Sequence, residues 1–405
     1  MISSDGDNAP GTVYYGLAMS IMASVNLFVP DMIIPFGIGV FCTSLGDGFA
    51  GLFGQLLNFP KNVKIYGNKT LYGCLYNFLI CILVVAFFNV SFSLGMKWWH
   101  CLVVAVFATE LELFTGRGLD NITITLGSSF LAYFLLNFEQ AGNYLVPILL
   151  TPLIIVFAKK KEVLTTSGII AAFLVDIVIS FSLKNSGFIL LSAFLSGGII
   201  VDKIKKKNKK TKQNEKYPIE KRGECRDHVQ VLANSFVATI FSLLYVISKE
   251  EIFVLGFVAS LAEAMSDTAA SGIGLLSGKA YDVFRMKKCE AGLSGGVSLL
   301  GSASSLVGAL VIATLSFALG LLDSVGKLFL VTFAAFLGAL FDSMLGSLLQ
   351  IKYKCKLCGT VVEREEHCGE PTEKYSGIRI VNNDVVNFLG TLFSALICVA
   401  FYTLQ

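Results

Sequence analysis

Residues 263–301 read EAMSDTAASGIGLLSGKAYDVFRMKKCEAGLSGGVSLLG, and this stretch decides both the expected fold and the expected chemistry. An apolar segment leads into Glu263 and Asp267, small residues follow, and a basic loop then leads to a Gly/Ser-rich opening of another apolar segment. A carboxylate inside a membrane helix is costly and usually has a functional reason. Carboxylates followed by cations and backbone donors suit a metal-bound polyphosphate at a membrane surface.

The composition indicates a helical protein that crosses a bilayer several times. The chain has 405 residues, of which 54% are hydrophobic and 15% charged, and its mean hydropathy is +0.70. Long continuous apolar runs recur from end to end, as bilayer-spanning helices require. The ten cysteines are scattered, mostly within apolar segments, and do not form the pattern of a disulfide framework. The short acidic N-terminus does not resemble a cleavable signal.

We therefore expect an all-α polytopic membrane protein with about thirteen transmembrane helices. Lys and Arg gather in alternate loops, so the positive-inside rule predicts a protein of the cell membrane whose N-terminus and motif loops are cytoplasmic. The polar segment 203–224 is expected to be a flexible cytoplasmic linker. The expected spans are 12–29, 33–57, 71–95, 99–115, 121–138, 142–158, 166–183, 186–203, 227–248, 252–276, 291–321, 325–350 and 383–404.

One order of features occurs twice along the chain. In each half an acid among small residues precedes a basic loop and a Gly-rich helix opening, and a further acid and an Asn/Asp helix start follow. This order predicts two parallel tandem five-helix repeats, joined by three helices that restore the starting side of the membrane. The corresponding domains are residues 1–138 and 139–405, the second of which contains the linker and a Cys-rich loop at 351–381.

The polar clusters are expected at cytoplasmic helix ends, where they suit phosphate chemistry. Carboxylates from neighbouring helices can hold Mg²⁺, cations neutralise phosphate, and Gly-rich helix starts present N–H groups to anions. Asn121, Asn383 and Asp384 are expected at helix N-caps. Helix packing or capping alone would also explain Asp47 and Asp267. The chain has no G-x-x-x-x-G-K-S/T motif and no set of kinase loops, which excludes a P-loop or protein-kinase fold.

A second constellation precedes the last apolar segment. Cys355, Cys358, His367 and Cys368 follow the pattern C-x2-C-x8-H-C. Four such ligands in one loop predict a structural Zn²⁺ site, and a set of free thiols is the alternative.

The same motifs carry a family resemblance. Residues 11–138 resemble the C-terminal portion of phytol kinase and, more distantly, dolichol kinase, through LGDGFAGLFG, GNKTLYG and ELELFTGRGLDNITITL. Residues 142–404 are similar to the integral membrane family that includes plant phytyl-phosphate kinase, through RDHVQVLANSFVATIFSLLY, SDTAASGIG, GLSGGVSLLG, FDSMLGSLLQ and NNDVVNF. Gly272 stands where that family's S-D-T-x-A-S-E pattern has an acid, so Glu263 or Asp342 would have to replace that acid as a ligand.

The resemblance implies a bifunctional isoprenoid kinase. The first half would use CTP or another nucleoside triphosphate to phosphorylate a prenol of the phytol, farnesol or geranylgeraniol type, and the second half would convert the monophosphate into the diphosphate. In each half, carboxylates would hold Mg²⁺ and a lysine would stabilise the transferred phosphoryl group. These residues are Asp47, Glu112 and Lys69 in the first half and Asp267, Asp342 and Lys288 in the second.

Further residues would bind the substrates. The nucleotide would contact Gly46, Gly48, Gly67, Thr70, Asp120, Asn121, Ser266, Thr268, Ser271, Gly295, Gly296, Asn383 and Asp384. The phosphate of the acceptor would contact Arg226, Asn234, Lys279, Arg285 and Lys287. The partners are then the prenol, its monophosphate and the lipid bilayer, without nucleic acid and with a homodimer left open.

Two other functions remain open at the level of sequence. A cytidylyltransferase would use the same nucleotide and metal but transfer CMP to a lipid phosphate. A transporter or flippase of lipid phosphates would also suit parallel repeats, but it should carry its polar groups near the bilayer midplane.

Overall fold

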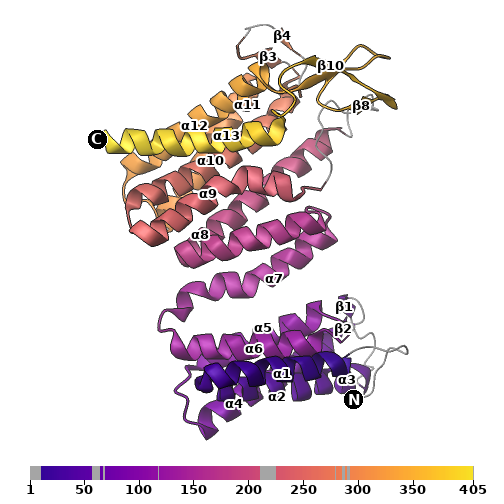
Figure 1. The fold of residues 1–405 in the computed structure, drawn as a ribbon, viewed down its shortest axis with the longest axis vertical. Helices are drawn as coiled ribbons and strands as arrows, with labels where there is room; N and C mark the ends of the chain where they lie inside the picture. Colours follow the sequence, from indigo (N-terminus) through magenta and orange to yellow (C-terminus); the bar gives the residue numbers. More distant parts are fainter. Residues whose placement is uncertain are drawn as a thin grey trace. The chain divides into compact units, whose positions relative to one another are not determined.

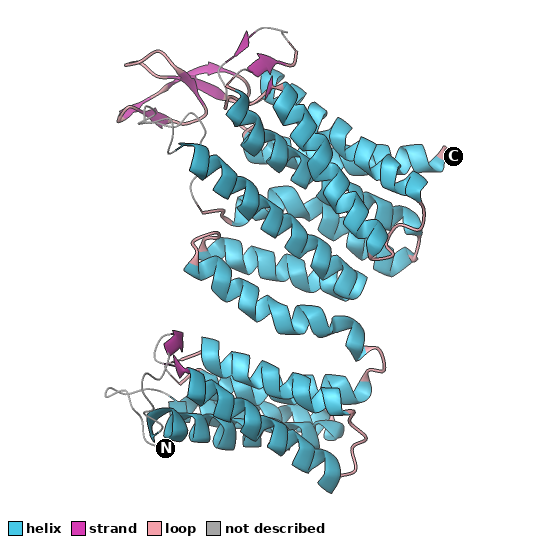
Figure 2. Cartoon of the chain, turned by 180° about the vertical axis from the view of Figure 1, so that it is seen from behind, coloured by secondary structure: helices cyan, strands magenta, loops and turns pink. Residues whose placement is uncertain are grey.

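The computed structural model is mostly helical, and it describes residues 11–56, 64–66, 69–116, 118–209, 225–278, 280–284, 288–289 and 292–404. The chain forms two compact units, Met1–Phe157 and Ala158–Gln405. Each unit is a bundle of helices whose connecting loops carry short strands (Figures 1 and 2).

The first unit packs α4, α5 and α6 with the α2–α3 segment around an apolar core, in which Ile38, Val85, Val104 and Ile124 are fully buried. Segment η2 is π-helical and continues α2 directly into α3. The elements are α1 (Gly11–Phe28), η1 (Pro30–Met32), α2 (Ile33–Phe41), η2 (Cys42–Asp47), α3 (Gly48–Leu56), β1 (Lys64–Tyr66), β2 (Lys69–Thr70), α4 (Leu71–Ser91), α5 (Trp98–Phe114), α6 (Asp120–Asn137), η3 (Ala141–Tyr144) and most of α7 (Leu145–Lys160).

The second unit contains the remaining helices and three small antiparallel sheets, with strand orders β4-β3-β5, β10-β6-β7 and β8-β9. Its helices are α8 (Thr166–Lys209), α9 (His228–Ser248), α10 (Glu251–Gly274), η4 (Leu275–Ser277), α11 (Leu299–Ala318), α12 (Val325–Leu348) and α13 (Asn383–Thr403). Its strands are β3 (Ala280–Asp282), β4 (Lys288–Cys289), β5 (Gly296–Val297), β6 (Lys352–Lys354), β7 (Val361–Val362), β8 (Glu366–His367), β9 (Glu370–Pro371) and β10 (Glu373–Ser376).

Helix α10 is the centre of the second unit. It packs against α8, α9, α11, α12 and α13. In its most apolar stretch 78% of the residues are buried, against 33% in α9 and 50% in α12. Leu255, Phe257 and Leu261 are fully buried along it. Gly308 lets α11 approach closely, because a Cβ at that position would lie 2.9 Å from the carbonyl oxygen of Met265.

Polar residues fix where several of the apolar helices begin. The side chains of Thr70, Ser298 and Asn382 each accept a backbone N–H at the start of α4, α11 and α13. Asp227 and Gln230 form a capping box at the start of α9. These caps satisfy N–H groups that the first helical turns leave without partners.

Several predicted helix starts differ from those observed. The N-cap of α13 is Asn382, so Asn383 and Asp384 lie inside the first turn, and Asn121 follows the first residue of α6. Helix α11 begins at Leu299 and not near residue 291, because Gly296 and the following valine form β5 and pair with β3.

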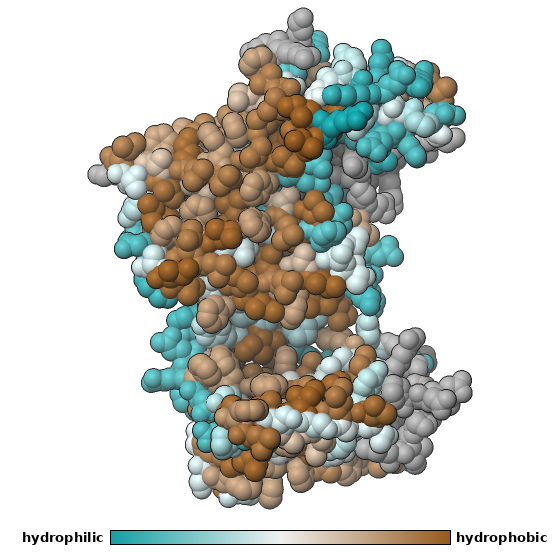
Figure 3. All heavy atoms as spheres, in the orientation of Figure 1, coloured by the Kyte–Doolittle hydropathy of each residue, from teal (hydrophilic) through white to brown (hydrophobic). Residues whose placement is uncertain are grey.

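Nine helical segments within the described residues are long and apolar enough to cross a membrane. Helix α8 counts once among them, although Lys184 (φ 58°, ψ −144°) interrupts its helical backbone. The structure thus has the mostly helical, multi-pass character that was predicted, whereas the count of thirteen spans and the parallel repeats stay predictions. Figure 3 shows hydrophobic side chains over the helices of the second unit and hydrophilic ones gathered over β8 and β10.

We expect Gly308→Ala to destabilise the second unit by about 1–3 kcal/mol, because the added methyl would press on Met265 and Ala269 of α10. Gly326→Ala is the matched control, since a Cβ there would have only the Oγ of Ser324 nearby, at 3.9 Å. Thermal unfolding of the purified protein in detergent measures both changes. Equal unfolding midpoints for the two variants would contradict the close packing of α11 on α10.

Candidate functional site

In the first unit, one lysine lies among three carboxylates from different elements. The Nζ atom of Lys69 lies 2.7 Å from Oε1 of Glu112, 3.2 Å from Oδ2 of Asp120 and 3.8 Å from Oδ1 of Asp47. All four residues were predicted to take part in binding or catalysis. The fold therefore brings together acids that are far apart in the sequence and places a single cation between them.

The local sequence explains how each group reaches this cluster. Asp47 ends the π-helical segment η2, and such segments are frequent at functional sites. Glu112 lies in the last turn of α5, and Asp120 begins α6. Thr70 caps α4, which holds the preceding residue, Lys69, at the start of that helix.

The cluster carries an excess of negative charge. Burial by itself would lower the pKa of Lys69, but the carboxylates of Glu112, Asp47 and Asp120 outweigh burial and raise that pKa above the usual lysine range. With its carboxylates ionised, the cluster has three negative charges against one positive charge, an excess of two. Oxygen ligands with this excess of charge suit Mg²⁺.

Two other predicted residues of the first unit hold the local backbone. The Nδ2 group of Asn121 donates to the carbonyl oxygen of Gly11 at 3.1 Å, which ties α6 to the start of α1. The hydroxyl of Thr70 accepts the N–H of Gly73 at 3.2 Å as part of the α4 cap.

The glycines of the first unit have different surroundings. A Cβ on Gly46 would lie 2.8 Å from Sγ of Cys81, so this glycine permits close packing on α4, whereas Gly48 faces open space. Gly67 lies outside the described residues. Beside Gly46, sequence analysis missed Asn77 of α4, which is fully buried and whose Nδ2 has no hydrogen-bond partner among the described residues.

In the second unit, a polar pocket lies where helices of the bundle meet the β4-β3-β5 sheet. Asp267 of α10 and Asp342 of α12 both line it, with Asn383 from the start of α13. Carboxylates from two helices thereby face the Gly-rich segment that precedes α11. The lining also includes Ser271, Gly274, Gly292, Ser294, Gly295, Gly296, Ser298, Gly301, Ser302, Ser305, Ser343 and Glu363.

The Gly-rich segment forms a tight turn and a strand. Gly295 has a φ of +88°, and a Cβ on it would lie 2.5 Å from the backbone nitrogen of Ser347 in α12. Only glycine fits this close approach. Gly296 then enters β5, which pairs with β3, so the segment presents backbone groups to the pocket before α11 begins.

Two residues of the loop 351–381 bind the backbone of Ser294, which lines the pocket. The N–H of Ser294 donates to Oε1 of Glu363 at 2.7 Å, and the carbonyl oxygen of Ser294 accepts from Nζ of Lys352 at 2.9 Å. Glu363 and Lys352 are themselves buried. Sequence analysis assigned neither of them to the site, because long-range contacts made by a loop leave no periodic pattern in the sequence.

The described lining residues include no lysine or arginine. Asp267, Asp342 and Glu363 are carboxylates, and an ionised carboxylate repels a polyphosphate unless a cation lies between them. Two carboxylates from facing helices are suitable oxygen ligands for Mg²⁺. The donor set of this pocket therefore fits a metal-bound phosphate better than a free one.

Several predicted residues make contacts that do not place them on the pocket wall. The Oγ of Ser266 lies 2.6 Å from Oγ of Ser305 and joins α10 to α11, and Thr268 donates to the carbonyl oxygen of Ala264. Lys288 lies on β4, the strand of the sheet that is furthest from β5. Asp384 also stands outside the lining.

The predicted contacts to the acceptor phosphate divide into two groups. A guanidinium nitrogen of Arg226 lies 3.6 Å from Oδ2 of Asp202, and Oδ1 of Asn234 accepts from Nδ2 of Asn387 at 3.5 Å. Neither Arg226 nor Asn234 lines the described pocket. Lys279, Arg285 and Lys287 lie outside the described residues.

The packing around Gly272 explains why glycine occupies this position. A Cβ on Gly272 would clash with Cγ1 of Val201 in α8, and Gly272 does not line the pocket. Glu263, the proposed replacement, is 1% exposed, and its Oε1 has no hydrogen-bond partner among the described residues. A Cβ on Gly390 of α13 would lie 2.7 Å from that oxygen and 3.3 Å from Cβ of Asp342, so this glycine leaves room for both acids.

The fold and these two sites define a helical integral membrane protein with two acid-lined sites. A family model described as integral membrane protein DUF92 matches residues 149–395, and the chain belongs to this family. No solved structure matches the chain.

Curated relatives of the chain come from archaea, cyanobacteria and plants. An uncharacterized membrane protein of Methanocaldococcus jannaschii is 24% identical over 65% of this chain and 96% of its own length. The chloroplastic protein VTE6 of Arabidopsis thaliana is 25% identical over 64% of this chain and 69% of its own. A phytol kinase of Synechocystis is 30% identical over 36% of this chain and 59% of its own.

We expect Lys69→Met to destabilise the first unit by about 2–3 kcal/mol, because it leaves buried carboxylates without their cation. In the Lys69→Met variant, Glu112→Gln should lower the free energy of unfolding by less than it does in the wild-type protein. The difference, which is the coupling energy of the pair, should be about 1–2 kcal/mol. Lys64→Met, at an exposed position of β1, should change stability by less than about 0.5 kcal/mol. Thermal unfolding in detergent measures the cycle, and additive effects would show that Lys69 and Glu112 do not interact.

Proposed function

We propose that this protein is a membrane isoprenoid kinase with two active sites, which phosphorylates a prenol to its monophosphate and then to its diphosphate. The proposal rests on one observation: each unit gathers carboxylates from separate helices at a polar site. The phytol kinase among the relatives gives the acceptor class, an isoprenoid alcohol. A nucleoside triphosphate such as CTP is the proposed phosphate donor.

In the first unit, the proposed reaction joins the prenol hydroxyl to the γ-phosphorus of the nucleotide. The bond from that phosphorus to its bridging oxygen breaks, the nucleoside diphosphate leaves, and the hydroxyl proton is lost. Asp47, Glu112 and Asp120 would hold Mg²⁺, which supplies positive charge to the phosphates. Lys69 would turn from the carboxylates toward the transferred group, whose negative charge would then favour the protonated ammonium. Such transfer depends mainly on positioning and electrostatics.

In the second unit, an oxygen of the prenyl monophosphate would attack the γ-phosphorus of a second nucleotide, the bond from that phosphorus to its bridging oxygen would break, and the nucleoside diphosphate would leave. Asp267 and Asp342 would hold Mg²⁺, and Glu263 would support Asp342 from the adjoining space between α10 and α13. The backbone of Gly295 and Gly296 would face the phosphates.

The position of the second pocket supports an enzyme more than a transporter. Its lining joins residues of the loop segment 292–298 to helix residues. Asp267 and Asp342 lie near the helix ends and Phe336 lies at the middle of α12, so the acids of the pocket gather toward one end of the helices. A transporter would require polar groups near the middle of the spans. We further propose that both sites face the cytoplasm at the cell membrane, as the loop charges indicate.

Asp47→Asn should lower phosphorylation of the prenol at least about 100-fold and leave phosphorylation of the monophosphate intact, and Asp267→Asn should do the reverse. Each substitution removes one charge that the proposed metal requires but preserves side-chain size. The assay supplies labelled nucleotide, Mg²⁺ and either phytol or phytyl monophosphate to purified protein in detergent.

Asp31→Asn and Glu250→Gln are the matched controls, because both residues are exposed and lie outside the two sites. Both controls should retain both activities. If Asp47→Asn and Asp267→Asn reduce the two reactions to the same extent, the assignment of one reaction to each unit is wrong.

A further inference from the structure

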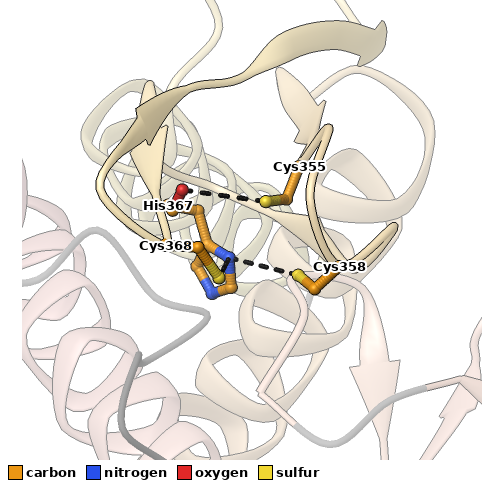
Figure 4. A group of neighbouring side chains, drawn as sticks. All are labelled: Cys355, Cys358, His367 and Cys368. Carbon is orange, nitrogen blue, oxygen red and sulfur yellow. Dashed lines mark hydrogen bonds between the residues drawn. The ribbon is translucent and has the colours of Figure 1, made fainter.

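Four metal-ligand side chains converge in the loop 351–381, apart from the acid-lined pocket. Cys355 and Cys358 lie on the β6–β7 hairpin, and His367 and Cys368 lie on the β8–β9 hairpin. One ligand atom from each lies within 4.8 Å of the others. Figure 4 shows the three thiols and the imidazole directed toward a common space.

The two nitrogen–sulfur distances in the cluster are close to those of a tetrahedral metal site. The Nδ1 atom of His367 lies 3.4 Å from Sγ of Cys358 and 3.3 Å from Sγ of Cys368. Zn–S and Zn–N bonds of ordinary length would separate sulfur and nitrogen by roughly 3.6 Å in a tetrahedron. Three thiolates and one imidazole form a ligand set that favours Zn²⁺ over harder cations.

The backbone of both hairpins is shaped to direct these ligands inward. In each hairpin the second ligand residue is a cysteine that is followed by a glycine. These glycines, Gly359 (φ +72°) and Gly369 (φ +81°), adopt left-handed conformations. The N–H of Gly359 donates to the carbonyl oxygen of Cys355 at 3.0 Å, which closes the first turn. Cys368 itself has a φ of 57°, a conformation that costs energy for a residue with a side chain and that a bond to a metal would offset.

The hairpins also reach the wall of the acid-lined pocket. Lys352 begins β6 in the first hairpin, and Glu363 lies between β7 and β8, in the segment that joins the two hairpins carrying the four ligands. These are the residues that hold the carbonyl oxygen and the N–H of Ser294. The β6–β7 and β8–β9 hairpins belong to different sheets, so a shared metal would fix their relative position.

We propose that Cys355, Cys358, His367 and Cys368 bind one Zn²⁺, and that this ion holds the two hairpins so that Lys352 and Glu363 fix Ser294 at the pocket wall. The ion has four protein ligands and therefore no open position for catalysis. Binding releases the thiol protons, and it couples metal affinity to the folding of the loop. The metal site stands independently of the kinase function, because its first readout is zinc content.

The test begins with the full-length protein, purified in detergent through a tag that requires no metal column. Elemental analysis should give one zinc per chain. Cys358→Ser and His367→Ala should each lower that content at least about 10-fold, whereas Cys225→Ser, a thiol outside the cluster, should keep it. Iron in place of zinc, or a Cys–Cys disulfide with no metal, would overturn the proposal.

A second measurement remains available if the cluster variants fail to fold. Zinc is removed from the wild-type protein with a chelator, and amide hydrogen exchange is followed at residues 292–297. The N–H of Ser294 should exchange at least about 10-fold faster without zinc, as it should in a Glu363→Ala variant that still contains zinc, because alanine removes the acceptor. Unchanged exchange at Ser294 after complete zinc removal would show that the metal does not support the pocket wall.

Discussion

The carboxylates of α10 impose the main constraint on the second unit. Glu263 and Asp267 lie on the most buried helix of the bundle, where a carboxylate without water or a partner costs free energy. The surrounding helices have glycine where they contact Glu263, at Gly338 of α12 and Gly390 of α13, which leaves space for its side chain. Asp267 lines the pocket. Helix packing and the candidate site are therefore consequences of the same few residues.

The first unit meets the same constraint in a different way. Its acids surround the ammonium group of Lys69, so one of their three charges is offset within the protein itself. The described part of the second pocket relies on hydroxyl groups, glycine backbone and an amide, with no lysine or arginine on its wall. The described residues of the two sites therefore differ, because a lysine lies among the acids of the first, whereas hydroxyl groups and glycine backbone lie beside those of the second.

The sequence predicted the helices well, because long apolar runs determine them directly, and α4, α9, α12 and α13 lie within a few residues of their expected limits. It also singled out Asp267 and Asp342, since acids within apolar segments are conspicuous, and both residues line the same pocket. It did not predict that the Gly-rich run forms β5, nor that Glu363 and Lys352 hold Ser294. Those features depend on contacts between loops distant in the sequence, and neither hydropathy nor residue spacing records them.

The most direct test of the proposed chemistry follows the phosphorus atoms of the nucleotide in the wild-type protein. Purified protein would be incubated with Mg²⁺, phytol or farnesol, and CTP or ATP labelled at either the α- or the γ-phosphate, and the lipid products would be separated. We predict that the γ-label appears first in the monophosphate and then in the diphosphate, with release of the nucleoside diphosphate. Transfer of the α-label to the lipid with release of pyrophosphate, or no labelled lipid with any of these prenols, would contradict a kinase.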